Sequence, residues 1–77
     1  MEEKVREVIN SWNPIEIYPL LEDEYNTETE KIMLAIRNTN STQELAGEII
    51  NVFTEAFGKE FTRSIEDCGV IAEEIIK

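Results

Sequence analysis

The strongest constraint on the fold of this chain is a helical pattern between residues 41 and 57. Ser41 and Glu44 have the spacing of a capping box, in which the serine oxygen accepts a backbone N–H and the glutamate reaches back to the helix start. Gly58 stands where a left-handed glycine ends many helices. Between these signals runs one wide apolar face, which must pack against other helices. Its members are Leu45, Ala46, Ile49, Ile50, Val52, Phe53, Ala56 and Phe57.

Two more helices are predicted ahead of this one. Apolar residues recur from Val5 to Trp12 at the spacing of one helical face, which predicts a helix over residues 2–12. Thr27 and Glu30 form a second capping-box pattern, which predicts a helix over residues 27–38.

The last helix runs to residue 76, and its start is open between residues 61 and 64. Phe61 either belongs to the helix or packs ahead of a cap at Thr62 or Ser64. Gly69 lies inside this helix at a cost of about 1 kcal/mol relative to alanine. That cost would be tolerated if another helix crosses closely at Gly69.

Two prolines interrupt the chain between the first two helices. The residue before a proline is disfavoured in the α region, so Asn13-Pro14 ends the first helix. The same pair suits the start of a new helical turn, with Asn13 as N-cap, over residues 14–18 and up to Pro19. Leu20 and Leu21 are expected to be structural residues that pack on the core.

No segment shows the alternating pattern of a β-strand, and the connections are short. The prediction is a single all-α domain over residues 1–77, a small antiparallel bundle of four helices at about 2–12, 27–38, 41–57 and 61/64–76, with a proline-bounded helical turn at 14–18.

The charge balance excludes several classes of function. Seventeen acidic residues against seven basic ones give a net charge of −10, which disfavours binding to nucleic acid. The absence of histidine excludes imidazole-based catalysis and imidazole metal ligands. Cys68 falls on the apolar stripe of the last helix, where a structural role is expected. With no signal peptide, no membrane-spanning run and one unpaired cysteine, the expected location is cytoplasmic.

The stretch from Trp12 to Tyr25 is the candidate site, because it combines aromatic, acidic and proline residues in an irregular segment. Trp12 continues the apolar face of the first helix and is expected in the core. No cofactor, metal or catalytic residue is predicted. The candidate interaction surface is Glu16, Tyr18, Glu22, Asp23, Glu24 and Tyr25.

The leading hypothesis is a non-enzymatic acidic module that binds a protein partner through residues 12–25, as a monomer or a homodimer. An alternative is an immunity or inhibitor-like protein whose acidic face neutralises a basic enzyme. A third is a metal-binding or small-molecule-binding protein that uses its carboxylates, although three adjacent acids cannot all face one ion from a regular segment.

One set of residues recurs in a familiar order along the chain: Trp12, Pro14, Glu24, Tyr25, Glu30, Ile32, Leu45, Ala46, Phe57, Gly58, Phe61, Cys68 and Ala72. This order resembles the YugE-like family of small uncharacterised proteins from Gram-positive bacteria. The resemblance covers essentially the whole chain, and it implies a compact all-α fold and a cytoplasmic location without a known activity, cofactor or partner.

Overall fold

The computed structural model describes residues 2–21 and 23–77, and it confirms the all-α fold with four helices. The helices are α1 (Glu2–Trp12), α2 (Asn26–Asn38), α3 (Thr42–Phe57) and α4 (Ile65–Ile76), and a single 3-10 turn, η1 (Gly58–Glu60), follows α3. The described residues contain no strand. Predicted and observed helix ends differ by one residue at most, once Ser64 is taken as the cap of α4.

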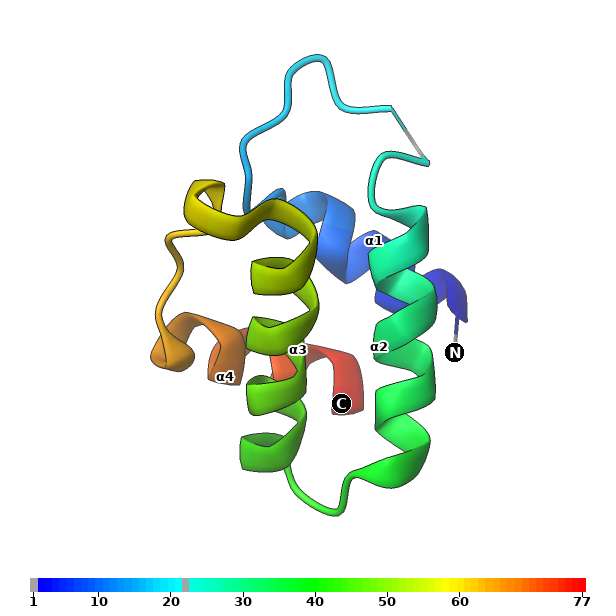
Figure 1. Ribbon diagram of the computed structural model, residues 1–77. Coiled ribbons are helices and arrows are strands. Elements are labelled where there is room, and N and C mark those ends of the chain that lie inside the picture. The colour runs from blue at the N-terminus through cyan, green and yellow to red at the C-terminus, as the bar shows by residue number, and fades with distance from the viewer. Residues whose placement is uncertain (1, 22) are drawn as a thin grey trace.

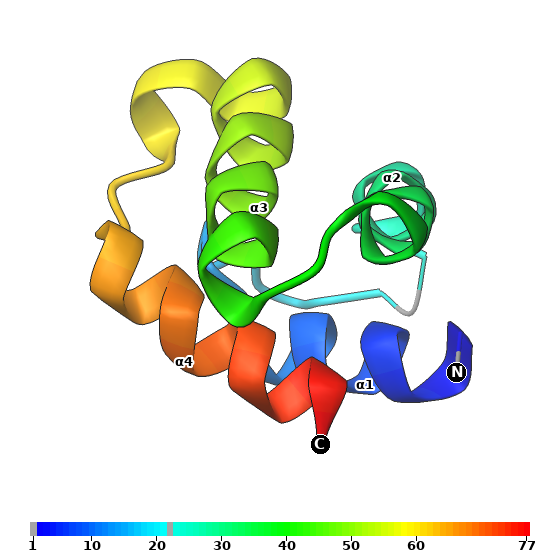
Figure 2. The same cartoon turned by 90° about the horizontal axis from the view of Figure 1, so that it is seen from below.

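The helices form two antiparallel pairs that cross (Figure 1). α2 and α3 make a hairpin, and α1 and α4 lie side by side across it, as the view from below shows (Figure 2). Short connections enforce the α2–α3 pairing, whereas α1 and α4 are brought together from the two ends of the chain. The α1–α2 loop lies at the top of Figure 1, and the start of α3 lies at the bottom.

The core lies where the two pairs face each other, and aromatic rings dominate one end of it. Phe53 stacks on Phe57 and Phe61, with ring centroids 6.0 and 5.4 Å apart. Trp12 meets Phe53 edge-on at 5.6 Å, as predicted for a core residue. Aliphatic side chains fill the remainder. The buried apolar side chains are Val5, Ile9, Tyr25, Ile32, Leu45, Ala46, Ile49, Val52, Phe53, Cys68, Ala72 and Ile75.

Local capping explains where α3 and α4 begin. The Ser41 hydroxyl accepts the Glu44 N–H at 3.2 Å, while the Glu44 carboxylate accepts the Asn40 N–H at 2.6 Å, one residue earlier than a standard capping box. Ser64 and Asp67 form a complete capping box, so Phe61 precedes the cap and packs against the core. The sequence left the start of the last helix open between residues 61 and 64, and the structure shows the later start, with Ser64 as the cap.

The capping box predicted at Thr27 is wrong. α2 begins one residue earlier, at Asn26, with Tyr25 as an N-cap that makes no side-chain capping bond. The Thr29 N–H already donates to the Tyr25 carbonyl at 2.8 Å. The buried Tyr25 ring fixes this start, because it holds the backbone at the entrance of the helix.

The condition that would explain Gly69, a close helix crossing, is not met. A Cβ atom placed on Gly69 meets nothing within 4 Å, and the same holds for Gly47 inside α3. Gly58, by contrast, has a φ of 57° at the end of α3, a backbone conformation that favours glycine. The predicted role of Gly58 is therefore confirmed, while Gly69 has no packing role inside the chain.

We therefore expect Gly69→Ala to raise the free energy of unfolding by about 1 kcal/mol, since alanine loses less backbone entropy in a helix and nothing blocks its methyl group. Urea denaturation measures the change. Gly58→Ala is the matched control, and its positive φ predicts destabilisation of about 1–3 kcal/mol. A destabilised Gly69→Ala variant would contradict the open space at this position.

Candidate functional site

The candidate site is the loop between α1 and α2, and it begins with Asn13 in a left-handed conformation. Asn13 has a φ of 44°, and its N–H still donates to the Ile9 carbonyl at 2.9 Å. Asparagine tolerates this conformation better than most residues do. Asn13 therefore ends α1 and does not start a new helix.

The helical turn predicted at residues 14–18 is consequently wrong. The Glu16 N–H donates to the Asn13 carbonyl at 2.9 Å, which closes a single tight turn. Glu16 also has a positive φ, 55°, and a right-handed helix cannot continue through such a residue. Pro14 thus serves a tight turn in this chain and not the first turn of a helix.

The Asn13 side chain holds the returning chain. Its Oδ1 atom accepts the Ile17 N–H at 3.1 Å, and its Nδ2 atom donates to the Ile17 carbonyl at 3.1 Å. Asn13 is only 6% exposed, so both bonds are largely shielded from water. One side-chain amide therefore satisfies both backbone polar groups of a loop residue that has no ladder partner.

Tyr25 links this loop to the core. Its hydroxyl donates to Asn13 Oδ1 at 2.6 Å and accepts the Ile15 N–H at 3.2 Å. Its ring meets Phe53 and Phe57 edge-on at 5.8 and 6.0 Å. Burial raises the pKa of the Tyr25 phenol, because the phenolate would lose its hydration, although the bond from the Ile15 N–H partly opposes this shift.

Tyr25 is 1% exposed, so its placement in the interaction surface is wrong. The ring and the hydroxyl are both occupied by contacts within the chain. Tyr25 can act on the loop only by holding it in position.

A further tie comes from the segment that precedes α4. Arg63 Nε donates to the Pro14 carbonyl at 3.3 Å, across 49 residues of sequence. Trp12, immediately before Asn13, meets the Phe61 ring edge-on at 6.1 Å. The base of the loop is therefore attached to α3 through Tyr25 and to the entrance of α4 through Arg63 and Trp12.

The tip of the loop, in contrast, exposes apolar side chains. Tyr18 is 78% exposed and Leu21 is 58% exposed, with exposed Pro19 between them. The expectation that Leu21 is structural is therefore wrong. Leu20 alone packs against the core, because adjacent side chains of a non-helical chain point in different directions.

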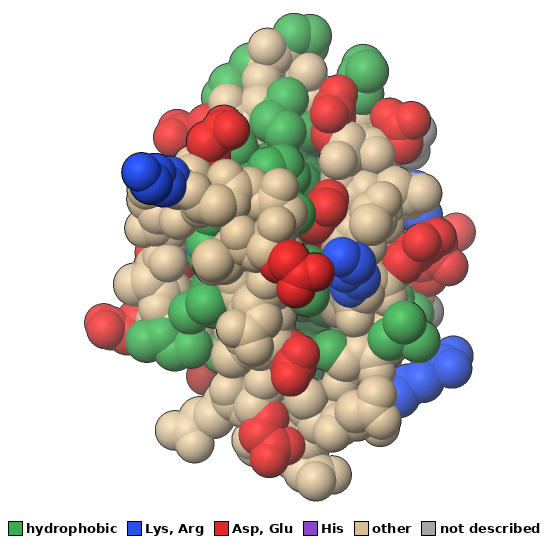
Figure 3. Space-filling view, in the orientation of Figure 1, with side chains coloured by type: hydrophobic (Ala, Val, Ile, Leu, Met, Phe, Trp, Pro, Cys, Tyr) green, Lys and Arg blue, Asp and Glu red, His purple; other side chains and the backbone are tan. Residues whose placement is uncertain are grey.

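Acidic side chains surround this tip. Glu16, Asp23 and Glu24 are exposed as predicted, and Glu22 lies outside the described residues. Hydrophobic side chains gather at the top of the molecule, with acidic side chains below them on either side (Figure 3). The structure thus brings together an apolar tip, formed by Tyr18, Pro19 and Leu21, and an acidic surround. We refer to the apolar tip and the exposed acidic residues Glu16, Asp23 and Glu24 together as the loop surface.

The search for a metal site covers the acidic and thiol side chains of the described residues. Between residues 2–21 and 23–77, no three carboxylate or thiol side chains gather into a group that could hold a metal ion. Cys68 is fully buried, in agreement with its predicted structural role. No helix in these ranges is long and apolar enough to cross a membrane.

Sequence reasoning overlooked the Asn13 side chain as an organising group, and it overlooked Leu21 as part of the surface. One signal for Asn13 was present: asparagine directly after a helical pattern is the commonest alternative to glycine at a left-handed helix end. Nothing in the local sequence indicates that the partner of Asn13 is Tyr25, twelve residues away.

We expect Tyr25→Phe to lower the free energy of unfolding by about 1–3 kcal/mol, because the Ile15 N–H loses its acceptor and Asn13 loses a buried bond. Urea denaturation tests this. Tyr18→Phe removes the same atom from an exposed ring and should change stability by no more than about 0.5 kcal/mol. Equal effects of the two changes would argue against a stabilising role for the Tyr25 hydroxyl.

We expect the buried Cys68 thiol to make the folded chain less stable in alkali. Burial, reinforced by Asp67, raises its pKa from 9.0 to about 11. Between these values the unfolded chain releases the proton while the folded chain keeps it, so the free energy of unfolding falls as the pH rises from 9 towards 11. Cys68→Ala, compared with wild type by urea denaturation across this range, should show the shallower decline. Parallel declines would assign the effect to other groups.

Comparison with protein families gives one match. The model described as a domain of unknown function, DUF1871, matches residues 4–77. Neither the curated proteins nor the solved structures include a match to this chain. Since the family model covers nearly the whole sequence, the chain belongs to the DUF1871 family.

Proposed function

We propose that this chain is a non-enzymatic protein-interaction module that binds a partner protein through the loop surface. The observation that carries the proposal is the contrast within one loop: Tyr18 and Leu21 are 78% and 58% exposed, while Asn13 and Tyr25 beneath them are buried and hydrogen-bonded. Exposed apolar side chains lower solubility in a free monomer, and binding recovers the free energy of their burial.

The anchored base favours binding without a large entropic cost. Asn13 holds both backbone groups of Ile17, and Arg63 holds the Pro14 carbonyl. A loop that is already ordered before binding loses less conformational freedom when a partner immobilises it. Tyr18 would serve as the central contact, since tyrosine provides a large contact area with few rotatable bonds.

The acidic residues around the tip suggest the chemistry of the partner. Glu16, Asp23 and Glu24 are exposed and flank the apolar residues in the sequence, and the whole chain carries a net charge of −10. A partner with a basic rim around an apolar hollow would match this pattern, and the opposite charges would speed association. Its binding should weaken as salt is added.

We further propose that the chain is a YugE-like member of its family, from a Gram-positive bacterium, and that it acts in the cytoplasm. The order of Trp12, Pro14, Tyr25 and Gly58 along the sequence supports the narrower family, and the single reduced cysteine, Cys68, suits a reducing compartment.

The loop surface can be tested by affinity purification from the source organism, followed by binding measurements with the purified partner. We expect a Tyr18→Ser, Leu21→Ser double variant to bind more weakly, with a dissociation constant raised about tenfold or more, because it loses a central aromatic contact. Leu34→Ser removes a similarly exposed leucine from α2 and should leave the affinity unchanged.

The melting temperature of each variant checks that it is folded. A folded double variant that recovers every partner with wild-type affinity would overturn the placement of the site on this loop.

A further inference from the structure

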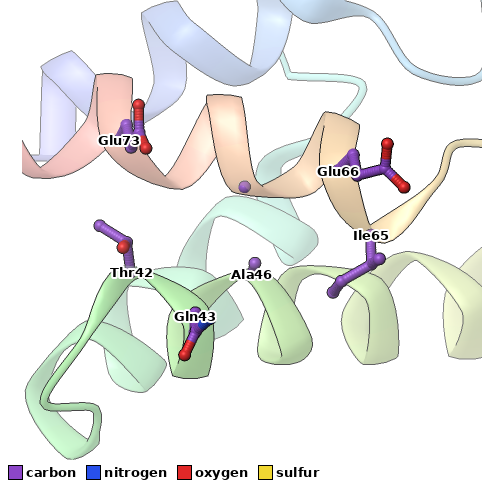
Figure 4. Close-up of a pocket in the computed structure, with 7 residues that line it drawn as sticks. Thr42, Gln43, Ala46, Ile65, Glu66 and Glu73 are labelled. Carbon is purple, nitrogen blue, oxygen red and sulfur yellow. The ribbon is translucent and has the colours of Figure 1, made fainter.

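A shallow groove lies between α3 and α4, away from the loop surface. It has a volume of about 450 Å³. Figure 4 shows Ile65 pointing from the start of α4 towards α3, and Thr42 pointing from the start of α3 towards α4. The groove is lined by Thr42, Gln43, Ala46, Ile65, Glu66, Gly69 and Glu73.

The small residues Ala46 and Gly69 leave the groove open. A Cβ atom on Gly69 would meet nothing within 4 Å. Glycine inside a helix costs about 1 kcal/mol relative to alanine, and in this chain no internal packing compensates for that cost. Alanine at position 46 and glycine at position 69, which both line the groove, would let a backbone from outside approach both helices closely.

Exposed isoleucines stand at the two ends of this region. Ile65 and Ile76 are each 50% exposed. A second hollow, which shares Thr42 with the groove, extends to Ile76. Eleven residues of α4 separate the two isoleucines, a distance of roughly 16 Å at 1.5 Å per residue. Three turns of a helix have this length.

The charge of the groove favours a cationic occupant. Glu66 and Glu73 are the charged residues among those that line it, and both are acidic. A second copy of this chain would bring another net charge of −10 against them, which opposes self-association. A cationic segment instead gains from both carboxylates.

We propose that the α3–α4 groove binds a cationic amphipathic helix of a partner protein. The apolar face of that helix lies over Ala46 and Gly69 and covers Ile65 and Ile76, and its lysine or arginine side chains reach Glu66 and Glu73. The groove and the loop surface lie at opposite ends of α3 (Figure 1), so the chain can hold two partners at once.

The probe for this proposal is a synthetic 18-residue helical peptide with leucine at every third or fourth position and lysine at most others. Binding is followed by fluorescence anisotropy and by amide chemical shifts of the full chain. We expect the largest shifts at Ala46, Ile65 and Gly69. A peptide with the same leucines and glutamate in place of lysine should bind at least about tenfold more weakly.

Two sets of variants test the groove itself. Gly69→Leu places an apolar side chain in the groove at a position where a Cβ atom meets nothing within 4 Å, and Glu66→Gln with Glu73→Gln removes the acidic rim. Each set of changes should weaken binding of the lysine peptide about tenfold. Glu3→Gln with Glu7→Gln is the charge-matched control, because it removes two exposed carboxylates from α1, outside the groove. Melting temperatures show whether each variant folds.

Several outcomes overturn the proposal. These are the absence of binding at millimolar peptide, equal loss of affinity in the α1 control, and shifts confined to the loop surface. If diluting the protein changes the chemical shifts of the groove amides, the chain self-associates there, and the occupant of the groove would be a second copy. The Tyr18→Ser, Leu21→Ser variant should bind the peptide like wild type, which separates this result from a failure of the proposed loop surface.

Discussion

The hydrogen bond from Tyr25 to Asn13, 2.6 Å long, joins the irregular part of this molecule to its core. Tyr25 packs its ring on Phe53 and Phe57, so the position of its hydroxyl is set by α3. Asn13 in turn fixes the turn that follows α1. The same hydroxyl accepts the Ile15 N–H at 3.2 Å, so two hydrogen bonds tie the chain between α1 and α2 to the residue that caps α2.

The arrangement matters because the domain is small. A chain of 77 residues buries a modest share of its surface, so the thirteen-residue loop between α1 and α2 is a large part of the whole. Buried backbone groups without partners are costly, and loops are where they accumulate. Asn13, Tyr25 and Arg63 satisfy four such groups, at Ile15, Ile17 and Pro14. The same contacts that limit this cost also hold Tyr18 and Leu21 outward.

The two proposed surfaces share a pattern of chemistry but differ in shape. Each places apolar side chains among carboxylates, and each therefore suits a basic partner. The loop surface projects from the molecule on an anchored irregular segment, whereas the α3–α4 groove is a hollow between two helices. A projecting tip enters a hollow in its partner, and a hollow receives a helix. Under the two proposals, the separation of these surfaces would let the domain contact two proteins at once.

The sequence by itself determined where the four helices lie, because the spacing of apolar residues and the caps of α3 and α4 are local features. Ser41 and Ser64 cap α3 and α4 through atoms three residues away, and the spacing of apolar side chains sets which face is buried. Tertiary structure decided the rest. Asn13 became a left-handed helix end, Tyr25 became an anchor, Leu21 became exposed and Gly69 was left in open space. These outcomes depend on Tyr25 meeting Asn13 and Phe53, and on α4 meeting α3 at an angle. Such contacts join residues distant in sequence, and a local pattern carries no information about them.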